Sequence, residues 1–252
     1  MRRSPYRRDI HPGTIPGGVL AWVTAFILLT TIDTVPARGQ EPERALPQLS
    51  ALEEIPLKQY RAYRRMHAKN EKFNHEAWLE AWTELDARGF RYEIVSERGS
   101  EYVRTKVLKT VLAREQELIA DGMSKRADLS ADNYVFAEAS SHGKGVRYIL
   151  IKPRREDMLL VDGRMVLNQD GTELLRVEGR LAKNPSFWTS LVNVIRDFAV
   201  LDGVRVPVTT ESIAKVKFAG LSRMVVEYEY ESINGRPVSL SARRTMAAAV
   251  GR

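Results

Sequence analysis

The stretch that decides the fold of this 252-residue chain is residues 203–231, GVRVPVTTESIAKVKFAGLSRMVVEYEYE. Apolar and polar residues alternate along two runs within it, 203–218 and 223–231. Because successive side chains of a β-strand point to opposite faces, a period of two places one face against a core and the other in water. The stretch therefore predicts two antiparallel strands with one apolar face. The apolar positions are Val204, Val206, Val208, Ala214, Val216, Phe218, Met224, Val226, Tyr228 and Tyr230.

The same alternation extends through most of residues 133–234. Further alternating runs occupy 147–152, 173–181 and 187–200. Dipeptides typical of tight turns separate the runs, namely Asp162-Gly163, Asp170-Gly171, Asp202-Gly203 and Asn234-Gly235. The pattern predicts a large antiparallel meander, and a sheet this broad must curl or close.

The segment before the meander predicts a hairpin and a helix. Residues 75–86, HEAWLEAWTELD, fit a helix by their Ala, Leu and Glu content, and a strand by their alternation. The turn signal at 86–89 and the alternating run 90–95 favour the strand, although the helix stays open at this stage. Residues 99–121 predict a helix with Ser100 as N-cap and Gly122 as its stop.

These elements predict an α+β fold, a large curled antiparallel sheet (an incomplete β-barrel) whose concave face is covered by a helix. A helix of this length covers about half of such a face. The rest of the face either lines a cavity for an apolar ligand or is filled by the chain itself. The expected cavity wall consists of Trp188, Val192, Val194, Val206, Val208, Val216, Phe218, Met224, Val226 and Tyr228.

The N-terminus has the features of a secretory signal. Four arginines precede the apolar run 19–32, which is short for a membrane span, and small residues follow at Ala37 and Gly39. We predict cleavage near Gly39/Gln40 and a periplasmic protein; an uncleaved anchor is the alternative. The predicted organisation is a signal peptide at 1–39, a linker or short helix at 40–57, one half-barrel domain at 58–235 and a C-terminal tail at 236–252.

Composition argues against several classes of chemistry. The chain has no cysteine, so disulfides, thiolate metal sites and a cysteine nucleophile are excluded. Its net charge of +7 falls to +4 when residues 1–39 are removed, so a nucleic-acid partner is not expected. We expect no metal, no cofactor and no catalytic residue. Ser140-Ser141-His142-Gly143 lacks the context of a nucleophile motif, and Glu227, Glu229 and Glu231 alternate as a solvated strand face would.

Two further features point to surfaces rather than to chemistry. The basic run 58–72 is expected to be a solvated face, with an anionic-lipid contact as the alternative. Phe187 and Trp188 are either ordinary strand core or an aromatic pair at the mouth of a cavity.

The segments that carry a family resemblance are YILIKP at 148–153, LLRVEGR at 174–180, DGVRVP at 202–207 and YEYESING at 228–235. With them, the order of elements resembles that of the LolA-like family of outer-membrane lipoprotein-sorting proteins. The resemblance covers residues 55–235 and rests on structural motifs. It implies a half-barrel that holds acyl chains beneath a helical lid, with lipid or acylated lipoprotein as cargo and a membrane protein as partner. It implies a monomeric carrier without enzyme activity. A protein-interaction or sensing module on the same fold is the alternative, and a secreted hydrolase is a third.

Overall fold

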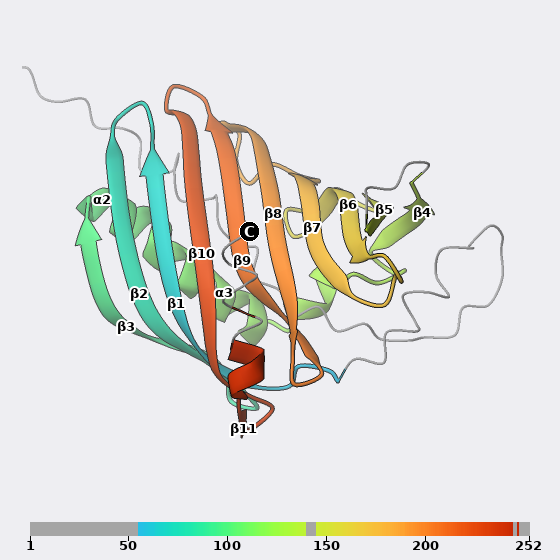
Figure 1. Cartoon of the computed structure of the whole chain (residues 1–252). Helices are drawn as coiled ribbons and strands as arrows, with labels where there is room; N and C mark the ends of the chain where they lie inside the picture. The colour runs from blue at the N-terminus through green and yellow to red at the C-terminus, as the bar shows by residue number, and fades with distance from the viewer. Residues whose placement is uncertain (1–54, 140–144, 244–245, 247–252) are drawn as a thin grey trace, which may run out of the picture.

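The computed structural model describes residues 55–139, 145–243 and 246. Its strands form one antiparallel sheet in the order β3-β2-β1-β10-β9-β8-β7-β6-β5-β4, with β11 paired to β10 (Figure 1). Strand β1 pairs with β10, so the first strand and the last long strand lie side by side within the sheet. The strands are β1 Tyr60–Asn70, β2 His75–Asp86, β3 Gly89–Gly99, β4 Tyr134–Glu138, β5 Val146–Pro153, β6 Val161–Asn168, β7 Leu174–Leu181, β8 Thr189–Leu201, β9 Val204–Val216, β10 Gly220–Ile233 and β11 Arg236–Pro237.

Two of the predicted turns are confirmed as tight hairpins. Asp202 and Gly203 join β8 to β9, and both have positive φ, as do Asn234 and Gly235 between β10 and β11. Positive φ at both central residues is the type I′ geometry, whose twist matches that of the flanking strands. These turns fix the registers of β8 against β9 and of β10 against β11.

The predicted helix is present and is continuous from Glu101 to Ala120. It consists of α2 Glu101–Val103, a π-helical segment η1 Arg104–Leu108 and α3 Lys109–Ala120, and a short 3₁₀ helix η2 Met123–Ala127 follows. The Ser100 hydroxyl accepts a hydrogen bond from the Val103 N–H (3.5 Å). Gly122 adopts a left-handed conformation after the last turn. Both predicted ends of the helix are therefore confirmed.

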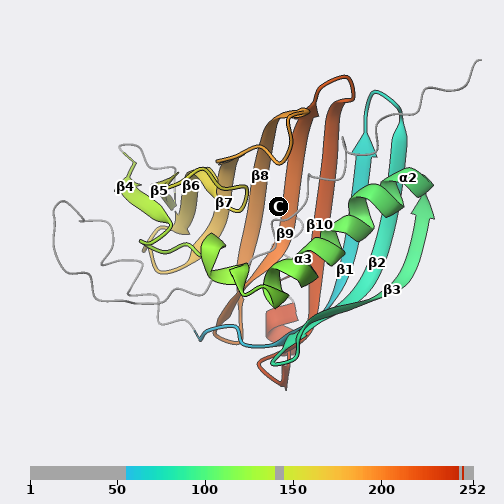
Figure 2. The ribbon, with the colours of Figure 1, turned by 180° about the vertical axis from the view of Figure 1, so that it is seen from behind.

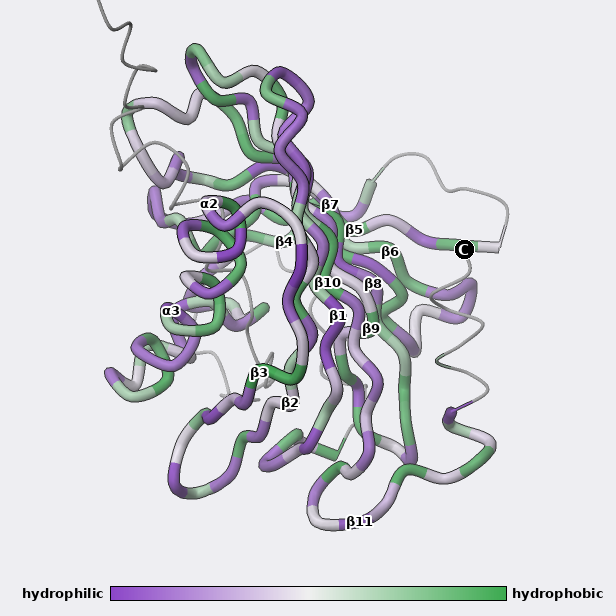
Figure 3. The backbone as a smooth tube through the Cα atoms, turned by 90° about the vertical axis from the view of Figure 1, so that its left-hand side faces the viewer, coloured by the Kyte–Doolittle hydropathy of each residue, from purple (hydrophilic) through white to green (hydrophobic). Residues whose placement is uncertain are grey.

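The helix lies across the concave face of the sheet. It crosses β2, β1 and β10 on one side of the sheet (Figure 2), and the edge-on view shows the helix and the sheet as two layers (Figure 3). The buried apolar residues of the helix join the core cluster that β1, β2, β3, β8, β9 and β10 form. A second cluster involves β4 to β8 and Leu129. The predicted fold class is therefore confirmed.

The structure decides two expectations from the sequence. Residues 75–86 form β2, which settles the open choice in favour of the strand. Asp162-Gly163 is not a turn but lies within β6, where Gly163 faces Gly179 of β7. A Cβ atom on Gly163 would lie 2.1 Å from the Glu178 carbonyl oxygen. The glycine therefore allows β6 and β7 to lie close together and does not reverse the chain.

The C-terminal segment is not a frayed tail over its described part. Val238, Ala242 and Met246 are buried in the main core cluster. The Ser239 N–H and hydroxyl donate hydrogen bonds to the two carboxylate oxygens of Asp202, at 3.0 and 2.7 Å. The segment that follows β10 is therefore part of the packed domain.

Candidate functional site

The concave face beneath the helix contains most of the predicted cavity wall. Eight of the ten wall residues have buried side chains and belong to the cluster that includes the helix. They come from β8, β9 and β10, the three central strands that the alternation defined. Together they form an apolar surface, which we call the floor: Val192, Val194, Val206, Val208, Val216, Met224, Val226 and Tyr228.

The other two wall residues lie at the end of the sheet. Strand β9 ends at Val216, so Phe218 falls in the turn before β10 and is 78% exposed. Its placement on the apolar face is therefore wrong. Trp188 precedes β8, is half-buried and packs against the core cluster. Its ring lies 6.0 Å from that of Phe218. These two residues form part of a rim and not of the floor.

The polar contacts that tie the helix to the sheet reach β1, β2 and β3. At its start, the Ser100 N–H donates to the Glu76 carbonyl (2.8 Å). Glu97 of β3 forms ion pairs with Arg104 and Lys109, both at 2.9 Å. These contacts anchor one long side of the helix along the β3 edge.

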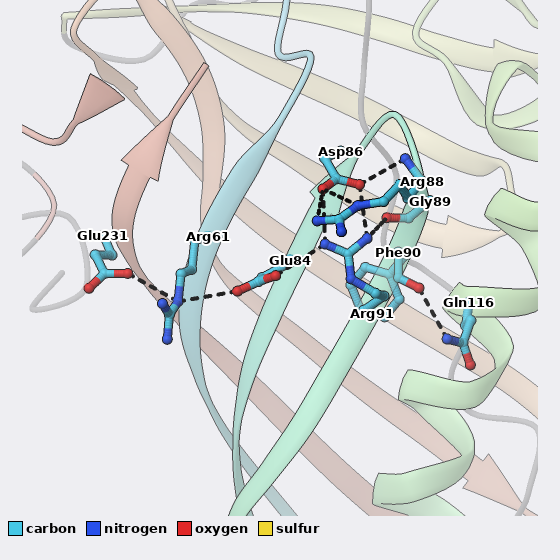
Figure 4. Close-up of polar contacts among 9 residues, drawn as sticks. All are labelled: Arg61, Glu84, Asp86, Arg88, Gly89, Phe90, Arg91, Gln116 and Glu231. Carbon is cyan, nitrogen blue, oxygen red and sulfur yellow. Dashed lines mark hydrogen bonds and ion pairs between the residues drawn. The ribbon is translucent and has the colours of Figure 1, made fainter. Parts of the chain in front are cut away.

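A further anchor lies near the end of the helix. The Gln116 amide donates to the Phe90 carbonyl at 3.1 Å, beside the β2–β3 turn (Figure 4). The same turn is fixed by Asp86, which accepts hydrogen bonds from Arg88 and Arg91. These bonds hold the pKa of Asp86 below its ordinary value. The β3 side of the helix is thus fixed to a rigid hairpin.

A buried ion pair connects the helix to the centre of the sheet. Glu115 of α3 accepts two hydrogen bonds from Arg64 of β1, at 2.5 and 3.0 Å, and both side chains are almost fully buried. Arg64 also donates to the Tyr60 hydroxyl (2.6 Å) and lies over the rings of Phe90 and Tyr228. The pair is a buried polar contact that connects the helix to β1.

Burial and pairing act in opposite directions on these two groups. Burial lowers the pKa of Arg64, but Glu115 and Tyr60 more than offset it, so the pKa is raised above its ordinary value. Burial raises the pKa of Glu115, and Arg64 only partly counteracts this. The guanidinium therefore stays charged, and the carboxylate depends on Arg64 for its stability inside the protein.

Polar groups continue across the floor from this pair. Arg196 of β8 is buried and its Nε donates to the Thr210 hydroxyl of β9 (3.3 Å). Burial lowers the pKa of Arg196. Arg196 lines a small cavity with apolar neighbours from β4, β6, β7 and β8. The concave face thus combines a mainly apolar floor with a polar belt formed by Arg64, Glu115, Arg196, Thr210 and Tyr228.

Two cavities along the concave face are small. One, beside Arg196 and Val194, has a volume of about 20 Å³. Another of about 20 Å³ lies between the start of the helix and the ends of β1 and β10. Small-molecule sites generally need about 300–1,000 Å³. In this arrangement these two spaces hold nothing larger than water, so an acyl chain can enter only if the helix moves.

Comparison with known proteins adds similar folds but no function. No protein-family model matches the sequence, and no curated protein matches it. A LolA superfamily protein from Nitrosomonas europaea is similar in structure, with 10% identity and a TM-score of 0.37 over 72% of this chain and 91% of that one. A DUF1329 family protein from Desulfovibrio piger has 10% identity and a TM-score of 0.34, over 73% and 88%.

Similarity at this level supports no conclusion about ligand or activity. The open curled sheet with a helix on its concave face has the architecture that the LolA-like resemblance implied. Among the described residues, no helix has the length and hydrophobicity to span a membrane. The predicted signal at 1–39 lies outside the described residues.

Sequence reasoning does not predict Arg64, Glu115, Arg196 or Thr210 as site residues, and Arg64 and Glu115 are the pair that ties the helix to the sheet. The sequence does hold a signal for both. Arg64 interrupts the inward series Tyr60, Ala62, Met66 and Ala68 of β1, all of which are buried. Glu115 continues the four-residue spacing of the buried helix residues 103, 107 and 111. A cation and an anion that each occupy an apolar stripe indicate a buried pair.

The structure also shows where the other segments singled out in the sequence lie. The basic run 58–72 is not one solvated face, because Arg64 points inward. Glu229 and Glu231 of β10 are on the outer face as predicted, where they pair with Arg65 and Arg61. Ser140–Gly143 lies outside the described residues. A further carboxylate, Asp157, is not a sequence candidate named above. It accepts hydrogen bonds from Arg126, Arg155 and the Leu159 N–H, which gives it a structural role.

Proposed function

We propose that this protein is an exported carrier that binds the acyl chains of a lipid or lipidated protein between the floor and the helix. The observation that carries the proposal is the asymmetry of the lid. The apolar floor on β8, β9 and β10 belongs to the same core cluster as the buried residues of a helix whose polar anchors lie on β1, β2 and β3. The helix can therefore swing about the β3 edge and uncover the floor while its outer anchors stay in place.

Exchange of the helix for an acyl chain on the floor changes the buried apolar surface little. The helix contributes apolar side chains to the same core as the floor, and an acyl chain would replace one apolar surface with another. Burial of each methylene group contributes about 0.8 kcal/mol. The main cost of opening is the separation of Arg64 from Glu115. A head group that carries a negative charge would meet Arg64 and Arg196 in the opened site, so the polar belt favours an amphiphile over a pure hydrocarbon.

The proposal includes a location and partners. A chain exported by residues 1–39 would work in the periplasm, where a soluble carrier with a covered acyl site moves cargo between membranes. Transfer would require an inner- or outer-membrane protein that opens the helix. The carrier function itself needs no catalytic residue and no cofactor.

The proposal is tested with the mature chain, residues 40–252, purified from its native compartment. Organic extraction and mass spectrometry are expected to recover phospholipid or a lipidated peptide in about equimolar amount. A matched pair on β8 provides the control. Val194→Phe fills the cavity beside Arg196, while Asn193→Phe places the same ring on the outer face. Val194→Phe should reduce bound lipid and Asn193→Phe should not. Equal loading of both folded variants would contradict the proposal.

A second function is favoured by one observation, the small size of the two cavities along the concave face. A permanently filled half-barrel would act as a protein-interaction or sensing module. Its expected result is a folded monomer whose organic extract contains no amphiphile and which does not take up a fluorescent fatty acid. The acyl-carrier proposal predicts uptake with a saturable stoichiometry.

A further inference from the structure

Three chain reversals bring exposed aromatic residues to one end of the sheet. They are the β1–β2 turn, the β7–β8 connection and the β9–β10 turn, which share the same end of the ribbon (Figure 1). Phe73 is 38% exposed, and Phe187 and Phe218 are each 78% exposed. Trp188 is half-buried beside them. We call these four residues, with Lys72 and Lys217, the aromatic rim.

Contacts between the three reversals make the rim one assembly. Lys72 donates to the Phe218 carbonyl at 2.7 Å, which links the first turn to the third. The Lys217 N–H donates to the Trp188 carbonyl at 2.7 Å, and its ammonium lies 4.0 Å from the centre of the Phe187 ring. The aromatic side chains are thus displayed in a fixed arrangement, although they are largely in water.

Phe218 is held outward at a cost in backbone energy. Its φ of 65° is left-handed, a conformation that is rare for a bulky side chain and destabilises the backbone. Burial of the ring does not offset this cost, because most of the ring is exposed. A strained residue that presents an exposed aromatic group is typical of a binding surface.

The rim is also strongly positive. The stretches 69–74, 183–188 and 215–223 contain six basic residues and one acid, Glu71. Arg223 pairs with Glu211 just outside these stretches, at 2.7 Å. Exposed aromatic rings among lysines match the interface of an anionic bilayer, where rings enter the head-group region and lysines meet lipid phosphates. The basic residues are Lys69, Lys72, Lys183, Lys215, Lys217 and Arg223.

We infer that the aromatic rim docks the protein onto the surface of an anionic phospholipid bilayer. The aromatic residues occupy protruding loop ends and not a recessed pocket, and protein hot spots are usually seated in pockets. The rim also lies at the mouth of the concave face. Lys69, Asn70 and Met224 line the small cavity between the helix and the sheet directly below it. Docking would therefore place the open end of the concave face against the bilayer. The inference that the aromatic rim binds the bilayer does not depend on whether the floor binds an acyl chain.

The test is flotation of the mature chain, residues 40–252, with vesicles. One set contains phosphatidylethanolamine and phosphatidylglycerol at about 7:3, and the other contains only phosphatidylcholine. Binding is expected to the anionic vesicles and to fall with added salt. Lys72→Gln with Lys217→Gln should weaken it about 30-fold, since each lysine near an anionic surface contributes roughly a factor of five. Phe187→Ser with Phe218→Ser should weaken it by about tenfold or more.

The matched control removes exposed apolar side chains elsewhere. Val95 on β3 is 52% exposed and Leu150 on β5 is 47% exposed, and Val95→Ser with Leu150→Ser should leave vesicle binding unchanged. Equal urea midpoints for all variants establish that each one is folded. Failure of the unmodified chain to float with anionic vesicles would overturn the inference. Unchanged binding by both rim variants would also overturn it, as would retention only on vesicles that carry a membrane protein.

Discussion

The ion pair between Arg64 and Glu115 gives the sharpest prediction about the lid. Arg64→Met leaves a buried carboxylate without its partner, and Glu115→Leu leaves a buried guanidinium with the Tyr60 hydroxyl and aromatic rings. Removal of one partner of a buried pair costs about 3–5 kcal/mol, whereas replacement of both by apolar residues is often neutral. Each single variant should therefore lose about 3–5 kcal/mol of unfolding free energy, and the double variant about 0–2.

The loss should appear first in the helix. Glu115 connects α3 to β1, so its removal weakens the closed position of the helix more than it weakens the sheet. About 3 kcal/mol corresponds to roughly a 150-fold increase in the local opening equilibrium. Amide hydrogen exchange of residues 105–120 in Glu115→Leu should accelerate by about that factor. In the double variant, exchange of the same amides should return to within about tenfold of the unmodified protein.

The assays are urea unfolding at 25 °C and pH 7, followed by circular dichroism, and hydrogen exchange read by mass spectrometry. From the four unfolding free energies, the coupling between the two residues should be about 3 kcal/mol or more. A double variant that loses the sum of the two single losses would refute the reasoning. Equal acceleration of exchange in the helix and in β9 would also refute it, because the pair would then stabilise the whole domain rather than the lid.

Three further predictions concern stability. Asp157→Asn should destabilise the protein by about 1–3 kcal/mol at pH 7. Burial raises the pKa of Asp157, but the Leu159 N–H and two arginines lower it below its ordinary value. The stability difference between the two proteins, measured by urea unfolding, should therefore vanish as pH falls below about 4, and a difference that stays constant with pH would contradict this. Phe218→Asn should raise stability by about 0.5–1 kcal/mol, because Asn tolerates positive φ, and a lower melting temperature would count against strain there. Gly163→Ala should cost about 1–3 kcal/mol through the clash with the β7 backbone, and a neutral effect on the melting temperature would show that the strands can separate.

The strands of the floor could be predicted because their signal is local. Period-two alternation in 203–231 assigns each side chain to a face without knowledge of the partner strand, and Asp202-Gly203 fixes the hairpin. Eight of the ten wall residues are accordingly buried on the predicted face. Phe218 was misplaced because β9 ends at Val216, and the turn that follows breaks the alternation.

The remaining features depend on contacts that local patterns do not contain. Asp162-Gly163 has the same turn chemistry as Asp202-Gly203, but its glycine is needed for close approach to Gly179, which only the β6–β7 pairing shows. Arg64 and Glu115 are 51 residues apart and meet because β1 lies beneath the helix. The aromatic rim unites three turns from different parts of the chain, so its charge and aromatic content were visible only as separate segments.

The central claim is that acyl chains lie on the floor beneath the helix. It is tested most directly by photo-crosslinking the mature chain with a palmitoyl probe that carries a diazirine near its end, followed by peptide mass spectrometry. The account predicts saturable adducts on the concave residues of β8, β9 and β10, such as Val194, Val206 and Met224, and competition by unlabelled palmitate. Adducts confined to Phe187, Phe218 and the outer face of the sheet would contradict the claim and leave the protein with a surface lipid contact alone.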